Sequence, residues 1–141
     1  SVADSMANAA FYFGAAYALA HLPVPPETEL SFADAKQNFY AAARDGLGTR
    51  IRWLKGREGT IKEICETSLV DMAEDGLRSL GIDSDEIAHW LGIIRARLEN
   101  GQTGAVWQRA WVARHGKQFR EMTEHYLEQQ QTGRPVHQWR I

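Results

Sequence analysis

The segment from Val2 to Leu22 constrains the fold most, because it is rich in alanine and aromatic residues and carries Asp4 as its only charge. Such a composition predicts a helix covered on most sides, which requires other helices of the chain to pack around it. Its longest apolar run, Ala9 to Ala20, falls short of the ~18 residues that indicate a membrane span. The segment Pro23 to Pro26 ends the helix, because proline lacks an amide donor and restricts the residue before it. We therefore expect a Pro-rich, extended link after the first helix.

A second helix is predicted to begin after Ser31, which caps it, with Asp34 at the third helical position. Its apolar residues recur at helical spacing and predict a face buried in the core. These residues are Phe32, Ala35, Phe39, Ala43 and Leu47.

Two further helices are predicted to form a hairpin. The first runs from a capping box at Thr60 to Gly81, and the second from Asp83 to Gly101. Their apolar residues at helical spacing are Ile61, Ile64, Leu69, Met72 and Leu77 in the first, and Ile87, Leu91, Ile94 and Leu98 in the second.

A fifth helix is predicted from near Thr103, with Trp107 and Trp111 one turn apart. This pair could stack a ligand ring, but burial of both side chains in a core is the preferred interpretation. A sixth helix is predicted over Lys117 to Gln131, and the tail from Thr132 is too short for another element. Its inward residues are expected to be Phe119, Met122, Tyr126 and Leu127.

No alternation of apolar and polar residues is long enough to predict a strand. The sequence therefore predicts an all-α fold, a compact bundle of about six helices without a β-sheet, as a single domain over residues 1–141.

The charge balance limits the partners that the chain can have. With 16 Lys and Arg against 18 Asp and Glu, the net charge of −2 provides no global attraction to nucleic acid or to an anionic membrane. The single cysteine, Cys65, cannot cross-link its own chain, which favours a reducing, cytoplasmic location. The chain begins at Ser1 without an initiator methionine and enters a helical segment directly, as expected for a fragment of a longer protein.

The sequence offers no pattern typical of a protein-only metal site, because no two histidines lie three or four residues apart. The densest basic cluster surrounds Trp53 and could contact phosphates or a nucleic-acid backbone. A solvated helix end is the preferred interpretation, since cations are favourable near a helix C-terminus. The cluster consists of Arg50, Arg52, Lys55 and Arg57.

Asn38 and Arg44 stand apart from the apolar stripe of the second predicted helix. At ~100° per residue, they lie on opposite flanks of the side away from the stripe. Neither is needed for a local core, so both are candidates for binding as well as for ordinary solvation.

Two short motifs follow each other in the sequence, the first over Asn38 to Leu47 and the second over Asn100 to Arg109. In this order they resemble the C-terminal part of the glutamate–cysteine ligase-like family of ATP-dependent carboxylate-amine ligases. The first family motif has Asn followed six residues later by Arg, and the second has a glycine-rich helix stop followed by Ala-x-x-Gln-Arg. Asp45 stands where the family more often has an aromatic residue. The matching residues are Asn38, Ala42, Ala43, Arg44, Gly46 and Leu47 in the first motif, and Gly101, Gly104, Ala105, Gln108 and Arg109 in the second.

The resemblance implies that the chain is the helical C-terminal portion of an enzyme that activates a carboxylate with Mg-ATP and joins it to an amine, typically glutamate to cysteine. It further implies ATP and Mg as cofactors of the parent enzyme, small amino-acid substrates, and a β-rich catalytic domain of the same polypeptide as the partner. The fragment alone is expected to bind no cofactor and to have no ligase activity.

Under this resemblance, Arg44 and Arg109 would each present a guanidinium to a substrate carboxylate or an ATP phosphate. Asn38 and Gln108 would orient those groups or hydrogen-bond the ligand directly. Two alternatives stay open: both arginines could instead form salt bridges to the catalytic domain, or the chain could be a free-standing helical interaction domain that docks a protein partner.

Overall fold

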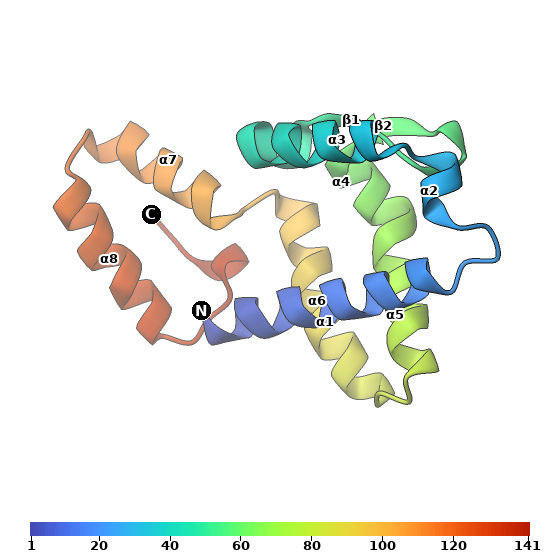
Figure 1. Cartoon of the computed structure of the whole chain (residues 1–141). Helices are drawn as coiled ribbons and strands as arrows, with labels where there is room; N and C mark the ends of the chain where they lie inside the picture. Colours follow the sequence, from blue (N-terminus) through green and yellow to red (C-terminus); the bar gives the residue numbers. More distant parts are fainter.

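Three helices form the centre of the molecule. The computed structural model, which describes residues 1–141, places α1 (Val2–Ala20) across a hairpin of α5 (Val70–Ser79) and α6 (Ser84–Asn100) (Figure 1). Buried side chains from all three helices fill the space between them. They comprise Ala7, Ala15, Val70, Ala73, Leu77, Ile87, Leu91, Ile93, Ile94 and Leu98. The all-α class and the predicted hairpin are therefore confirmed.

Helices α1 and α5 approach each other so closely that their backbones touch. A Cβ atom added to Gly14 would collide with the carbonyl oxygen of Ala73, and one added to Gly76 would collide with the carbonyl oxygen of Gly14. Only glycine permits this crossing. The opposite side of α1 is open, with Tyr12 75% and Phe13 56% exposed. The expectation that α1 is covered on most sides is therefore wrong, because α5 and α6 cover one side only.

The segment predicted as one helix from Thr60 to Gly81 contains a wider turn. It begins as α4 (Ile61–Ile64), continues as a π-helical turn over Cys65–Leu69, and passes into α5. Thr60 and Glu63 form the expected capping box at its start. Cys65 is buried in the wider turn, and desolvation, with the nearby Glu66, raises the pKa of its thiol to about 11.

A short helix and a small sheet occupy the stretch that links α1 to α4. Helix α2 (Pro26–Glu29) follows the Pro-rich link, and strands β1 (Arg50–Arg52) and β2 (Glu58–Thr60) pair antiparallel, with Ile51 opposite Gly59. The prediction of no β-sheet was wrong, because three-residue strands are too short to show an alternating pattern. In the loop between them Lys55 adopts a left-handed conformation (φ 58°).

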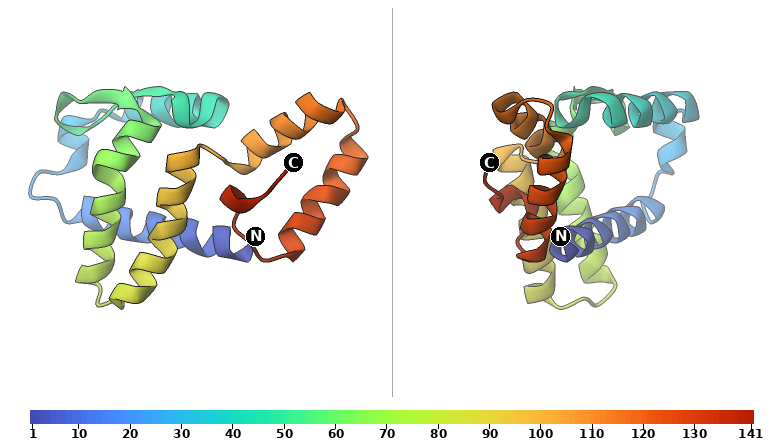
Figure 2. Two further views of the ribbon diagram at one scale, coloured as in Figure 1. Left: turned by 180° about the vertical axis from the view of Figure 1, so that it is seen from behind. Right: turned by 90° about the vertical axis from the view of Figure 1, so that its left-hand side faces the viewer.

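Helix α3 (Phe32–Asp45) lies at one edge of the molecule above α4 (Figures 1 and 2). Ser31 caps it as predicted, but none of its residues is buried, and Phe32 and Phe39 are 83% and 71% exposed. The prediction that its apolar stripe faces the core was therefore wrong. The helix instead turns a polar side inward, where Asn38 exchanges two hydrogen bonds with the backbone of Arg52.

The C-terminal part forms a second, smaller helical unit of α7 (Gly104–His115) and α8 (Phe119–Gln131) (Figures 1 and 2). The tail returns between these helices, makes a 3-10 turn over Val136–Gln138, and buries Trp139. The prediction that the tail adds no element was thus wrong. The cluster around it consists of Trp107, Trp111, Val136 and Trp139, with Val112, Met122 and Tyr126 packed against it.

The burial of Trp107 and Trp111 confirms the core interpretation of the tryptophan pair. Of the residues expected to point inward from α8, Met122 and Tyr126 pack against this cluster, whereas Phe119 and Leu127 are 56% and 50% exposed. The length and apolarity needed for a membrane crossing are met by no helix in the structure.

Candidate functional site

A surface groove of about 630 Å³ lies where the end of α3 and the start of α4 meet α7. One wall comes from the last turn of α3, the 3-10 turn Gly46–Gly48 and the first residues of α4; the other comes from the connection before α7 and its first turns. Arg44 lies on the first wall and Arg109 on the second. The groove therefore brings together the two arginines of the sequence motifs, which are 65 positions apart in the chain.

Arg44 stands in the last turn of α3, where a cation is favourable beside the exposed carbonyl groups. Its Nη2 lies 2.7 Å from Oδ2 of Asp45, and 77% of the Arg44 side chain is exposed. A hydrogen bond from this guanidinium keeps the pKa of Asp45 below its ordinary value. An exposed pair of neighbouring residues is readily exchanged for another anion, because it is worth little in water.

The second wall begins with a helix N-terminus. The hydroxyl of Thr103 accepts a hydrogen bond from the amide of Val106. The residues of this segment that line the groove are Thr103, Ala105, Val106 and Arg109. The first amides of a helix have no partner within the helix and carry a partial positive charge. Arg109 is exposed in the second turn of α7.

A third cation, Lys62, lines the same groove from the start of α4. Its ammonium lies 3.7 Å from Glu66 and donates a long hydrogen bond of 3.4 Å to the carbonyl oxygen of Glu99. Both contacts are weak enough to be exchanged for a bound anion. Asp45 is the one carboxylate in the lining, against Arg44, Lys62 and Arg109. The groove is therefore electropositive and suited to a carboxylate or phosphate group.

The other two predicted site residues lie outside the groove. Nδ2 of Asn38 donates to the carbonyl oxygen of Arg52 at 2.7 Å, and its Oδ1 accepts from the Arg52 amide at 3.3 Å. These bonds attach α3 to β1 and occupy both ends of the amide group. Gln108 is exposed on α7 and does not line the groove. The structure thus brings Arg44 and Arg109 together but gives Asn38 a structural contact.

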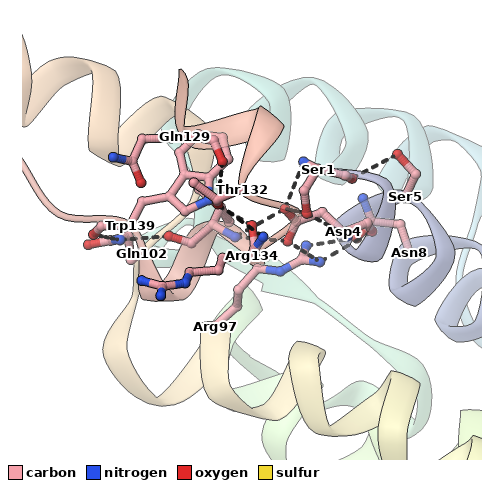
Figure 3. A network of polar contacts seen from close by, with 11 residues as sticks. Ser1, Asp4, Ser5, Asn8, Arg97, Gln102, Gln129, Thr132, Arg134 and Trp139 are labelled. Carbon is pink, nitrogen blue, oxygen red and sulfur yellow. Dashed lines mark hydrogen bonds and ion pairs between the residues drawn. The ribbon is translucent and has the colours of Figure 1, made fainter. Parts of the chain in front are cut away.

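A second polar cluster joins the two ends of the chain and was not foreseen from the sequence (Figure 3). Oδ1 of Asp4 lies 3.2 Å from Nη2 of Arg97, and both side chains are largely buried, with 13% and 14% exposed. Asp4 also accepts a hydrogen bond from the amide of Val136 at 3.0 Å, and Arg97 donates to Oδ1 of Asn8 at 2.8 Å. Apart from Nε of Arg97, which is buried without a hydrogen-bond partner, these groups are paired with one another, which indicates a structural junction.

The ionisation of this junction follows from its contacts. Burial acts to raise the pKa of Asp4, but hydrogen bonds from the N-terminal amine and hydroxyl of Ser1 and from the Val136 amide, with the charge of Arg97, lower it overall. Burial lowers the pKa of Arg97, and the Asp4 charge partly offsets this. No local pattern announces the pair, because Asp4 and Arg97 are 93 positions apart.

The basic cluster around Trp53 lies on the β1–β2 hairpin, so its interpretation as a helix end was wrong. Arg52 faces Asp34 at 3.6 Å and Glu58 at 3.9 Å, and Arg57 donates to the hydroxyl of Thr67 at 2.7 Å. These contacts reduce the charge available to a phosphate backbone. Nowhere in the structure do three His, Cys, Asp or Glu side chains gather as a metal site would require.

Comparison of the chain with family models, curated proteins and solved structures found no match. The groove that contains Arg44 and Arg109 is therefore the main structural indication of a function.

Proposed function

We propose that the chain is the helical C-terminal portion of a cytoplasmic ATP-dependent carboxylate-amine ligase of the glutamate–cysteine ligase-like type. In this proposal it contributes one flank of the active site and is inactive alone. The partner is a β-rich catalytic domain of the same polypeptide, and the substrates are small amino acids.

One observation supports the proposal above all others: the arginines of two separate motifs line a single electropositive groove. Motif matches in an alanine-rich helical chain can arise by chance. Convergence of their two charged members on one groove is not required by the fold, because neither arginine has a role in the core. A planar guanidinium suits bidentate binding of a carboxylate or phosphate.

The groove fits part of the chemistry that the parent enzyme needs. ATP supplies the phosphoryl group that activates the carboxylate, and Arg44 and Arg109 would bind and orient anionic groups beside it. The groove lacks the clustered carboxylates that hold Mg²⁺, so the catalytic domain would supply the metal ligands. Asn38 and Gln108 enter the proposal in a supporting role, Asn38 by fixing α3 through Arg52.

The proposal is tested in the full-length protein by measuring Mg-ATP-dependent amide formation between glutamate and cysteine. We expect Arg44→Ala and Arg109→Ala each to lower kcat/KM by about 10- to 100-fold, as for loss of one charge-assisted contact to a ligand. Arg120→Ala is the matched control, because this arginine is 91% exposed on α8, far from the groove lining.

Unchanged kcat/KM in both groove variants would remove the arginines from the site. Absence of any nucleotide-dependent amide formation with a panel of amino acids would overturn the assignment to this reaction. The isolated 141-residue chain is expected to show no turnover.

A free-standing helical interaction domain is the second candidate function. It is favoured by α3, whose aromatic residues point to solvent instead of into a core. An elution volume in size exclusion that stays the same when each candidate protein partner is added would argue against it.

A further inference from the structure

The orientation of α3 is the reverse of that expected for a surface helix. Such helices normally bury their apolar stripe and expose their polar side. Here Asp34 and Asn38 face Arg52 of the hairpin, and the carbonyl of Ala41 accepts a hydrogen bond from Thr49. The side that is left to solvent is apolar.

The exposed side of α3, which we call the α3 face, carries three aromatic rings. Phe32, Phe39 and Tyr40 are 83%, 71% and 63% exposed, and the last two rings contact each other edge to face, with centroids 5.7 Å apart. Ala35, Lys36 and Ala43 are the other exposed members. Contiguous apolar surface of this kind marks an interaction site.

The occupant of the α3 face can be chosen from its pattern of large and small side chains. When two copies of α3 are laid antiparallel about a two-fold axis between residues 37 and 38, Phe32 of each falls opposite Ala43 of the other. The same operation sets Tyr40 opposite Ala35, and Phe39 opposite Lys36. Every ring therefore meets a small or flexible side chain, which is the condition for interdigitation at a helix interface.

Charge is compatible with this arrangement. Lys36 is the only ionisable charge on the face, and its methylene stem can lie along a Phe39 ring while the ammonium extends to water. Antiparallel helices also place opposite ends of their dipoles together. Nothing on the face would attract a nucleic acid or a strongly charged peptide.

The area is sufficient for a weak but specific pair. The three rings expose roughly 400 Å² per copy, since a buried aromatic side chain covers ~150–250 Å². With the two alanines and the Lys36 stem, the two copies would bury about 1,200 Å², the lower end of the range for specific interfaces. The position of α3 at an edge of the molecule leaves it accessible to a second copy (Figure 2).

We propose that the chain forms a symmetric homodimer through antiparallel packing of the α3 faces of two copies. The α3 face contributes nothing to the core of its own chain, so its role is to bury the same face of another. This inference does not rest on the ligase proposal and is tested without it.

The first experiment is light scattering after size exclusion, and sedimentation, of the 141-residue chain from ~1 to ~200 µM, a range that brackets the micromolar affinity expected for this area. The wild type is expected to move from monomer to dimer. The double variant Phe32→Ser/Phe39→Ser is expected to weaken dimerisation at least ~100-fold, since it removes two aromatic anchors from each copy. Its circular dichroism should stay unchanged, because both side chains are already solvated.

The matched control is Phe119→Ser, which removes a ring that is 56% exposed on α8 and is expected to leave the dimer intact. A wild-type monomer at the highest concentration overturns the proposal and leaves the face to a different partner, such as the catalytic domain of the parent enzyme. A dimer that survives in the double variant also overturns it.

A second experiment tests the antiparallel register. Under mild oxidation, a mixture of Ala35→Cys and Tyr40→Cys chains is expected to form mixed disulfide dimers faster than either variant alone, because these positions oppose each other only in the antiparallel pair. The native Cys65 is buried and does not interfere. Faster cross-linking of either variant with itself would overturn the proposed packing.

Discussion

Asp4 is the side chain with the most varied contacts in the structure. Asp4 lies in the first turn of α1. Its carboxylate accepts a hydrogen bond from the amide of Val136 in the tail and forms an ion pair with the guanidinium of Arg97 in α6. Removal of a buried acceptor leaves its donors without a partner, and this costs more free energy than the hydrogen bond itself contributes. The carboxylate of Asp4 therefore joins the tail to α1 and α6, and the side chains of Asn100 and Gln102 add hydrogen bonds to the backbone of the tail.

We expect Asp4→Asn to lower the free energy of unfolding at pH 7 by about 2 kcal/mol, because Arg97 loses its buried counter-charge. The pKa of Asp4 is lower in the folded chain than its ordinary value of 3.8, so its contribution is complete above that value and is lost as the pH falls through the folded pKa. Urea unfolding at pH 7 and at pH 3 measures both effects.

In this comparison the gap between wild type and Asp4→Asn should narrow at the lower pH. Asp75→Asn serves as the control, since this side chain is 76% exposed and faces only Arg78 at the surface. An equal gap at both pH values would contradict the assigned role of the carboxylate.

The sequence predicts the roles of some single residues but not of others. The caps at Ser31 and Thr60 follow from local spacing, and the structure confirms both. The partnership of Asp4 with Arg97 joins residues far apart in the chain, and only the packing of α1 against α6 brings them together. The two motifs identify Arg44 and Arg109 as candidates, but their shared groove depends on how α3 and α7 are placed in space.

The packing of α1 on α5 determines the central architecture of the chain. Gly14 and Gly76 face each other where the two backbones touch. The close approach increases the dispersion contacts between the two helices. It requires two glycines inside helices, each of which is less favourable there than alanine by about 1 kcal/mol.

We expect Gly76→Ala to destabilise the fold by about 3 kcal/mol or more, because the new Cβ meets the backbone of Gly14 and the helices must separate. Gly92→Ala in α6 is a matched control with the same chemical change. No atom lies within 4 Å of a Cβ added at Gly92, so higher helix propensity should stabilise the fold by about 0.5 to 1 kcal/mol. Thermal or urea unfolding of both variants gives the comparison, and equal effects would exclude a steric cause.

Helix α3 shows where prediction from periodicity ends. The pattern predicted its start and its apolar stripe, and both exist. Periodicity identifies which residues share a side of a helix, but it contains no information on whether the chain itself covers that side. The two hydrogen bonds of Asn38 with Arg52 decided the orientation, and they involve a strand too short to be predicted.

At the scale of the whole molecule, the structure has two apolar centres of different origin. The larger lies among α1, α5 and α6, and the smaller surrounds Trp107, where the tail folds back between α7 and α8. The indole nitrogen of Trp139 donates to the carbonyl of Arg134 at 2.7 Å, and its ring meets Tyr126 edge to face at 4.9 Å. The helical unit of α7 and α8 thus depends on the last residues of the chain.

We expect Trp139→Ala to weaken α7 and α8 selectively. Removal of a buried indole costs about 3 to 5 kcal/mol of unfolding free energy. The cavity that it leaves would adjoin the ring of Trp107 in α7. Native-state hydrogen exchange should show faster opening of α7 and α8 amides with little change in α5 and α6. Phe119→Ala, on the exposed side of α8, is the control, and uniform loss of protection through all helices would show that the two centres unfold as one.

The general architecture could be predicted from the sequence, whereas the small sheet and the tail could not. Long helices carry many repeats of their pattern, so α1, α5 and α6 are well determined by it. The tail owes its structure to Val136 and Trp139, which gain burial only after α7 and α8 have formed. The all-α class thus follows from local sequence patterns, whereas the burial of Val136 and Trp139 follows only from the assembled fold.

The buried thiol of Cys65 has a practical consequence. With a pKa of about 11 and almost no contact with water, it stays protonated and inert to alkylating reagents at neutral pH while the wide turn between α4 and α5 is closed. Reaction of Cys65 with an alkylating reagent therefore requires local opening of the fold. The rate at which iodoacetamide modifies this sulfur reports how often the structure around Cys65 opens, in the wild type and in every variant that keeps Cys65 as its single cysteine.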